Sequence, residues 1–142
     1  MSGFLLDTNV ISELIRPRPD HKVIAWFEKT DENLLYLSVL TLGEIRKGVA
    51  TLADAKRRVS IEAWLEKDWR NRFDGRILPI SEQIADRWGA LAGHAQAKKK
   101  LIPVIDGLLA ATAIHHNLTL VTRNTKDVVS TGVGVFNPWQ EI

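Results

Sequence analysis

The chain has 142 residues, of which 45% are hydrophobic, and it carries a formal net charge of +2. This length and composition predict one domain over residues 1–142 with its own buried core. No apolar run reaches the ~18 residues of a membrane span and no basic leader is seen, so we expect a cytoplasmic protein without membrane contact. The absence of cysteine excludes disulfides, thiolate catalysis and sulfur-based zinc sites, and it leaves hard, oxygen-binding cations as the candidate metals.

The first predicted strand runs directly into a carboxylate. Residues 3–6 are apolar, and Asp7 follows them just before residues 10–15, which read as a short helix that Pro17 ends. Asp7 is therefore expected at the end of a buried strand, where open α/β sheets bind ligands. The alternative is that Asp7 only caps the following helix by accepting a backbone N–H.

A second strand–helix unit contains Glu44. Residues 34–39 form a short apolar run typical of a buried parallel strand, after a helix that Asp20 is expected to cap. The next helix has a core-facing stripe, and Glu44 lies off this stripe in what we predict to be the first turn. A capping box from Thr41 to Glu44 is the alternative explanation for this carboxylate. The stripe consists of Leu42, Ile45, Val49 and Leu52.

Residues 53–73 are predicted to be helical and are rich in both charge and tryptophan. Lysines and arginines alternate there with apolar side chains that include Trp64 and Trp69. A charge run of this kind is usually a solvated helix face. Tryptophan beside arginine is also enriched among the anchors of protein interfaces, so partner binding is the better functional hypothesis for this segment.

The next strand candidate is residues 76–80, which Pro79 places at an edge of the sheet. Ser81 is expected to cap the helix that follows. Residues 98–100 are three lysines near the end of that helix, where they complement its dipole or meet phosphates. The predicted core-facing residues of the helix are Ile84, Trp88, Leu91 and Ala95.

Asp106 lies in an otherwise apolar segment in which Pro103 fits the first turn of a helix. A carboxylate near an exposed helix N-terminus gains only about 0.3–1 kcal/mol. Desolvation among apolar neighbours would cost more, so we expect a cation or a hydrogen-bond donor beside Asp106. His115 and His116 end this helix before Asn117, the expected C-cap, and no spacing typical of histidine metal ligands is present.

Polar side chains also follow the fourth predicted strand, residues 118–122, which runs into Thr122-Arg123-Asn124. Residues 132–136 give a short final strand. Alternating strands and helices predict a parallel sheet with right-handed crossovers, so the C-terminal ends of the strands share one side of the molecule.

An acidic, oxygen-rich cluster is therefore expected at that side of the sheet. Such a cluster suits one or two Mg²⁺ or Mn²⁺ ions, and the reaction it supports is attack of metal-activated water on a phosphodiester. The residues expected to converge are Asp7, Glu44, Asp106 and Asn124.

The combination of motifs resembles the PIN-domain ribonucleases. In chain order the motifs are Leu6-Asp7-Thr8-Asn9, Glu44, Pro103-x-x-Asp106-x-Leu108-x-Ala110-Ala111 and Thr122-Arg123-Asn124. Within that family the sequence is most similar to the VapC and FitB type toxins of bacterial toxin–antitoxin pairs, including the terminal Phe136-Asn137-Pro138-Trp139.

The resemblance implies a three-layer α/β/α domain with a central, mainly parallel sheet, and an endoribonuclease that depends on Mg²⁺ or Mn²⁺. It also implies a cognate antitoxin as protein partner, homodimerisation, and contact with DNA only through the antitoxin. Asp7, Glu44 and Asp106 match the metal-site acids of the family, and Thr122 matches the hydroxyl residue beside them.

Asn124 is a departure from the family pattern, because many relatives have aspartate at this position. Asparagine can still donate a carbonyl oxygen or orient a water, so Asn124 stays among the predicted catalytic residues. Asp127, three residues further on, is the carboxylate that could take the place of the missing acid.

Other enzyme classes fit less well. A haloacid dehalogenase type phosphotransferase needs a second aspartate where this chain has Asn9, and no glycine-rich phosphate loop is present. The remaining alternative is a catalytically weak or inactive PIN-fold module that binds a protein partner or nucleic acid, a reading that Asn124 favours slightly.

Overall fold

The structure is a computed structural model that describes residues 2–140. No helix in this described part is both long and apolar enough to cross a membrane. The strands are β1 (Phe4–Leu6), β2 (Leu35–Ser38), β3 (Ile77–Leu78), β4 (Thr119–Val121) and β5 (Val135–Phe136). The helices are α1 (Thr8–Leu14), α2 (His21–Lys29), α3 (Val39–Ala50), α4 (Ala55–Trp64), α5 (Arg70–Arg72), α6 (Glu82–Ala97), α7 (Val104–His115) and α8 (Thr125–Val128), with short turns η1 (Glu32–Leu34), η2 (Leu65–Trp69) and η3 (Val129–Thr131).

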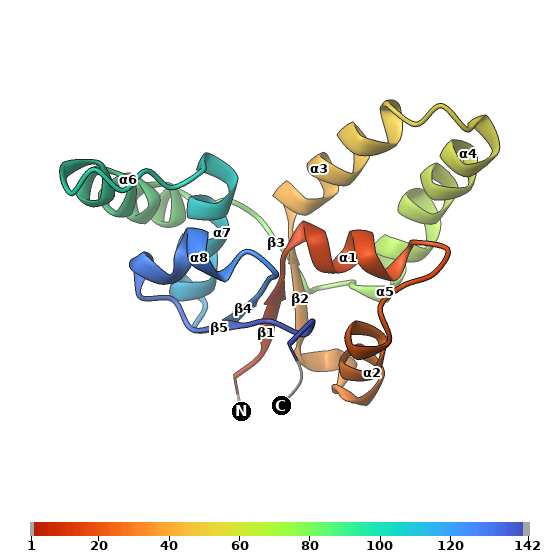
Figure 1. Cartoon of the computed structure of the whole chain (residues 1–142), viewed down its shortest axis with the longest axis horizontal. Coiled ribbons are helices and arrows are strands. Elements are labelled where there is room, and N and C mark those ends of the chain that lie inside the picture. Colours follow the sequence, from red (N-terminus) through yellow and green to blue (C-terminus); the bar gives the residue numbers. More distant parts are fainter. Residues whose placement is uncertain (1, 141–142) are drawn as a thin grey trace.

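A sheet with the strand order β3-β2-β1-β4-β5 forms the middle layer (Figure 1). Every pair of neighbouring strands is parallel, and β1 lies between β2 and β4. In Figure 1, helices α1 to α5 lie on one side of the sheet and helices α6 to α8 on the other. The predicted three-layer α/β/α fold with a parallel sheet is confirmed, and β3 lies at an edge as Pro79 predicted.

The core consists of one hydrophobic cluster on each face of the sheet. Side chains alternate across a strand, so the neighbours Leu5 and Leu6 enter different clusters. Leu6 packs with residues of β2, of helices α1 to α4 and of η2, which contributes the wholly buried Trp69. Leu5 packs with Leu109 and Ala110 of α7. Leu5 and Leu6 are both fully buried, and this fixes the position of the C-terminal end of β1 in the sheet.

The predicted start of the helix that carries Glu44 is wrong by about one turn. Ser38 is the N-cap, and its side chain accepts the Leu40 N–H at 3.0 Å. Glu44 therefore lies in the second turn of α3, and the capping box from Thr41 to Glu44 does not form. Because the cap is formed by another residue, a local role no longer explains the Glu44 carboxylate.

Trp69 is one of the two tryptophans behind the hypothesis that residues 53–73 bind a protein partner, and for this residue the hypothesis is wrong. Residues 53–73 form α4, the π-helical turn η2 and α5, and this path turns Trp69 into the core, where its exposure is 0%. Its ring packs edge-on against Trp64, with 5.1 Å between the ring centroids. The indole Nε1 finds no hydrogen-bond partner among residues 2–140, which is unusual for a buried tryptophan.

Two predicted helix ends are shifted by a residue. Pro103 is the N-cap of α7 rather than part of its first turn. At the other end His116 is the C-cap, and Asn117 follows it with a positive φ of 56°. Asp106 nevertheless lies in the first turn of α7.

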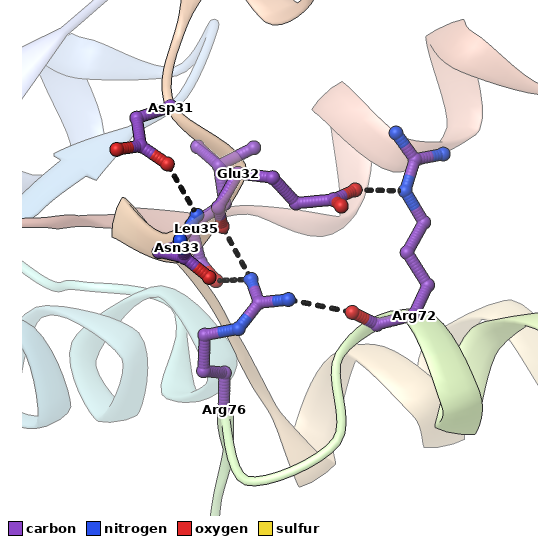
Figure 2. Close-up of polar contacts among 6 residues, drawn as sticks. All are labelled: Asp31, Glu32, Asn33, Leu35, Arg72 and Arg76. Carbon is purple, nitrogen blue, oxygen red and sulfur yellow. Dashed lines mark hydrogen bonds and ion pairs between the residues drawn. The ribbon is translucent and has the colours of Figure 1, made fainter.

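Arg76 joins the connections at the N-terminal ends of β2 and β3 (Figure 2). Its Nη1 donates to the carbonyl oxygens of Glu32 at 2.5 Å and Leu35 at 2.6 Å, and its Nη2 donates to the carbonyl oxygen of Arg72 at 2.5 Å. Arg72 in turn forms an ion pair with Glu32. These contacts fix the end of the sheet opposite to the expected acidic cluster.

We expect Arg76→Met to destabilise the fold by about 2 kcal/mol, because hydrogen bonds from a charged donor to three carbonyl oxygens are lost. The carbonyls of the exposed residues Glu32 and Arg72 can recover water, whereas Leu35 is buried. Equilibrium unfolding in urea measures the destabilisation. Arg70→Met on the exposed side of α5 is the matched control, since Arg70 makes no side-chain hydrogen bond or ion pair with the described residues. Equal unfolding midpoints for the two variants would contradict the assigned role of Arg76.

Candidate active site

The predicted acids meet in one open pocket at the C-terminal edge of the sheet. The pocket has a volume of about 420 Å³. A cavity of similar volume, about 440 Å³, lies beside α8 and β5 and has no acidic side chain in its lining, so chemistry rather than size identifies the candidate site. The residues that line the acidic pocket are Asp7, Thr8, Asn9, Ser12, Glu13, Arg16, Glu44, Asp106, Arg123, Asn124 and Trp139.

Asp7 ends β1, caps α1 and is only 5% exposed. Its Oδ1 accepts the backbone N–H of Thr8 at 2.6 Å, and its Oδ2 accepts the hydroxyl of Thr122 at 2.7 Å. Burial raises the pKa of Asp7, the hydrogen bonds from Thr122 and Thr8 lower it, and the charge of Glu44 raises it further. Helix capping therefore accounts for the hydrogen bond to Oδ1 of Asp7, while Oδ2 is hydrogen-bonded to Thr122 behind the pocket.

Thr122, the predicted hydroxyl residue, lies behind the pocket rather than in its lining. It follows β4 and is 1% exposed. Besides donating to Asp7, its Oγ1 accepts the backbone N–H of Asn124 at 3.0 Å. Thr122 thus orients the Asp7 carboxylate and ties the end of β4 to it.

Glu44 reaches the pocket from α3 and is held there by a threonine of α1. The Thr8 hydroxyl donates to Glu44 Oε1 at 2.5 Å, and the buried Thr41 hydroxyl lies 3.3 Å from the same Thr8 oxygen. The backbone N–H of Thr8 is already bound to Asp7. Thr8 therefore contacts two of the three acids, and it connects the first and second strand–helix units.

Asp106 lies in the first turn of α7 with its side chain half-buried. Burial, followed by the negative charges of Asp7, Asp127 and Glu44, raises the pKa of Asp106 to about 6. Like charges that gather without a counter-ion increase the affinity of a site for a proton or a cation. The surroundings of Asp106 therefore favour binding of the cation or hydrogen-bond donor that the sequence predicted beside it.

The position of Asp106 depends on close packing between α6 and α7. A Cβ atom at Gly107 would lie 3.0 Å from Cδ1 and Nε1 of the Trp88 ring. Glycine at this position lets the indole lie directly against the helix turn that carries Asp106. The predicted apolar face of α6 thus positions the third acid, although it contributes no polar atom to the site.

Asn124 lines the pocket as an exposed residue. It is the N-cap of α8, but its side chain makes no capping hydrogen bond, so the amide is available to the pocket. Asp127, the predicted substitute for the missing acid, is not among the lining residues, although its charge acts on Asp106.

Sequence reasoning missed several of the lining residues. The amide Nδ2 of Asn9 lies 3.3 Å from both Asp7 Oδ2 and Thr122 Oγ1. Its position two residues after a strand-end aspartate was a usable signal. Arg123 and Trp139 belong to motifs quoted for the family resemblance, but their place in the pocket could not be predicted, because they come together only through the pairing of β4 with β5.

The donor atoms of the pocket suit a hard divalent cation. Mg²⁺ and Mn²⁺ favour carboxylate and amide oxygens, which Asp7, Glu44, Asp106 and Asn124 supply. The raised pKa values of Asp7 and Asp106 indicate negative charge that a cation would offset. Within residues 2–140 no three His, Asp or Glu side chains are close enough to hold a metal ion together, so the acids surround the pocket instead of a single point.

Comparison with known proteins agrees with this architecture. Residues 4–128 match the family model of the PIN domain. The chain is 42% identical over 137 residues to the protein named Toxin FitB from Neisseria gonorrhoeae, covering 96% of this chain and 99% of that protein. It is 37% identical over 136 residues to the VapC ribonuclease Y4jK of Sinorhizobium fredii, covering 96% of this chain and 97% of that protein.

Solved structures show the same likeness. The crystal structure of FitAcB from Neisseria gonorrhoeae contains a chain with a TM-score of 0.92 and 41% identity, covering 97% of this chain and 99% of that chain. A structure of FitAB bound to the IR36 DNA fragment gives a TM-score of 0.91 and 40% identity, covering 98% of this chain and 97% of that chain. The chain therefore belongs to the PIN-domain family, in the group that contains FitB and VapC.

Proposed function

We propose that the protein is a metal-dependent endoribonuclease that acts as the toxin of a toxin–antitoxin pair. The observation that carries this proposal is the shared pocket, in which carboxylates from three distant parts of the chain, Asp7, Glu44 and Asp106, face the same space. Its relatives include proteins named as ribonucleases and as a toxin. Retention of all three acids favours this function over a binding module without activity.

In this proposal Asp7, Glu44 and Asp106 hold one or two Mg²⁺ or Mn²⁺ ions. A bound ion of this kind would supply an activated water and neutralise charge on the leaving oxygen of a phosphodiester. Because the acids surround the pocket at some distance from one another, metal binding would draw them together. The Asn124 amide is placed to offer a neutral oxygen or to orient a water where many relatives have a charged ligand.

Residues behind the acids keep the site in order. The Thr8 N–H holds Asp7 Oδ1 and the Thr122 hydroxyl holds Asp7 Oδ2, while the Thr8 hydroxyl holds Glu44 Oε1. Both carboxylates are therefore fixed in orientation where they line the pocket. Hydrogen bonds of this type orient metal ligands and raise metal affinity. Thr8 and Thr122 are therefore assigned positioning roles.

The partners that we propose are an antitoxin protein, an RNA substrate and a second copy of the chain, with DNA contacted only through the antitoxin. The support is the similarity to chains in structures described as FitAcB and as FitAB bound to a DNA fragment, both of which cover nearly the whole of this chain.

The test is cleavage of total cellular RNA by the purified protein, with mapping of the cut sites. We expect defined cuts with Mg²⁺ or Mn²⁺, loss of cutting in excess EDTA and recovery when Mn²⁺ is restored, because the proposed nucleophile is a water activated by the metal. Cleavage that persists in EDTA would contradict metal dependence. An absence of cutting with every divalent ion would favour the alternative of a PIN-fold binding module.

A further inference from the structure

The pocket contains more negative than positive charge. Carboxylates contribute four of its lining residues, whereas Arg16 and Arg123 are its two arginines. RNA is a polyanion, so its backbone needs cationic contacts at the mouth of such a pocket. Arg16 Nη1 lies 3.2 Å from Glu13 Oε1, and its charge is therefore partly neutralised. Within residues 2–140, Arg123 has no carboxylate at ion-pair distance.

Arg123 is held at the pocket by the ends of two strands. Val121 of β4 pairs with Phe136 of β5, and the Thr122 N–H donates to the Phe136 carbonyl at 3.0 Å. The residues after β4 therefore run beside the residues after β5. The backbone N–H of Arg123 also donates to Asn9 Oδ1 at 3.4 Å, so its main chain is connected to the residue that contacts Asp7.

Trp139 fixes the direction of the Arg123 side chain. The Trp139 N–H donates to Asn137 Oδ1 at 2.9 Å in a turn after β5, and the half-buried indole packs against the core. Arg123 Cζ lies 5.0 Å from the centroid of the indole ring, within the range of a cation–π contact. Arg123 is nevertheless exposed and lines the pocket, so this contact leaves the guanidinium accessible from the pocket.

We propose that Arg123 binds a backbone phosphate of the RNA strand that occupies the acidic pocket, and that Trp139 is the positioning residue that holds the guanidinium for it. An accessible planar guanidinium matches the oxygens of a phosphate in a bidentate contact. Arginine held by an aromatic ring loses less side-chain freedom when the contact forms. The inference rests on the proposed ribonuclease function, because it names the contact through which that same pocket receives its substrate.

The test combines cleavage kinetics with RNA binding. We expect Arg123→Ala to raise KM for a single-stranded RNA oligonucleotide about tenfold, with kcat nearly unchanged. In the Asp7→Asn background with Mg²⁺, fluorescence anisotropy with the same labelled oligonucleotide should show a similar loss of affinity. Loss of one phosphate contact should also reduce the slope of log Kd against log salt by about 0.7. Arg70→Ala, which removes the same charge from α5, is the control.

Trp139 is tested by a double-mutant cycle. Trp139→Leu should raise KM about threefold in the parent. Trp139→Phe keeps an aromatic ring and should keep KM close to that of the parent. When Arg123 is already alanine, Trp139→Leu should not raise KM further. Thermal melts show whether each variant is folded. If the Trp139→Leu variant does not fold, the single Arg123→Ala variant still tests the phosphate contact.

The outcomes separate this inference from the proposed function. If the parent cleaves RNA but Arg123→Ala leaves KM and the salt slope unchanged, the phosphate contact is wrong and the nuclease stands. If the parent never cleaves but Arg123→Ala weakens RNA binding with the expected salt slope, the nuclease is wrong and the contact stands. Weakened binding of a protein partner without any change in RNA binding would also overturn the inference.

Discussion

Asp7→Asn is expected to reduce RNA cleavage at least about 100-fold, because a metal ion contributes several kcal/mol to the transition state and loses a charged ligand. Asp7 is the most buried of the three acids and is bound to donors on both of its oxygens. Asparagine keeps the shape of the side chain and one carbonyl oxygen, so the loss would come from charge and not from packing. The measurement is the single-turnover cleavage rate with saturating Mg²⁺.

The same variant should be at least as stable as the parent when no metal is present. Burial raises the pKa of Asp7 in the folded state, so ionising this carboxyl near neutral pH works against folding. The neutral amide removes that penalty, and the Thr122 hydroxyl can turn to accept a hydrogen bond from it. We therefore expect an unchanged or higher urea midpoint in EDTA, which is the pattern of a residue kept for function at the expense of stability.

Asp54→Asn is the matched control for this substitution. Asp54 caps α4 at an exposed position, accepts the N–H groups of Lys56 and Arg57, and lies outside the acidic pocket. Asparagine caps helices about as well as aspartate, so both cleavage and stability should stay near those of the parent. A large loss of stability in Asp7→Asn, or cleavage equal to that of Asp54→Asn, would remove Asp7 from the proposed site.

Most of the sheet and its acidic edge could be predicted because they depend on local patterns. Short apolar runs end in polar residues at Asp7 and Thr122, and parallel strands bring such ends together whatever the lengths of the connections. Asp106 was identified as unusual because no neighbour in sequence could stabilise its charge. These signals need only the chain's order of apolar and charged residues.

Other features could not be predicted because they depend on contacts between distant elements. Ser38 and Thr41 are both good N-caps, and only the point at which β2 ends decides that Ser38 begins α3. The segment around Trp69 alternates charged and apolar residues in sequence, yet Trp69 lies in the π-helical turn η2 and is fully buried. Trp139 reaches the pocket only because β5 pairs beside β4, and no periodicity in the sequence records that pairing.

Asp106 should make the metal-free protein lose stability as the pH rises. Its folded-state pKa is about 6, raised from an ordinary value of 3.8, first by burial and then by Asp7, Asp127 and Glu44. The folded state therefore prefers the protonated carboxyl. The resulting stability is fully present below the unfolded pKa and is lost as the pH rises through the folded value. After allowance for the half-exposed position, the loss is about 1 kcal/mol.

We expect Asp106→Asn to remove this component of the pH dependence and most of the stabilisation by Mg²⁺. In the parent, Mg²⁺ binds the ionised acids, so it should raise the melting temperature near neutral pH and have little effect below about pH 5. The measurement is urea unfolding and thermal melting between about pH 4 and pH 8, with EDTA and with Mg²⁺. Burial and the neighbouring His115 also lower the pKa of His116, and subtracting the variant from the parent cancels that contribution.

Asp86→Asn on the exposed surface of α6 is the control, because it removes one carboxylate without touching the pocket. It should keep both the pH dependence and the response to Mg²⁺. If the Asp106→Asn protein still gains as much stability from Mg²⁺ as the parent, the ion binds elsewhere. The crowding of Asp7, Glu44 and Asp106 would then have to be offset by protons alone, and metal-dependent hydrolysis at this pocket would be wrong.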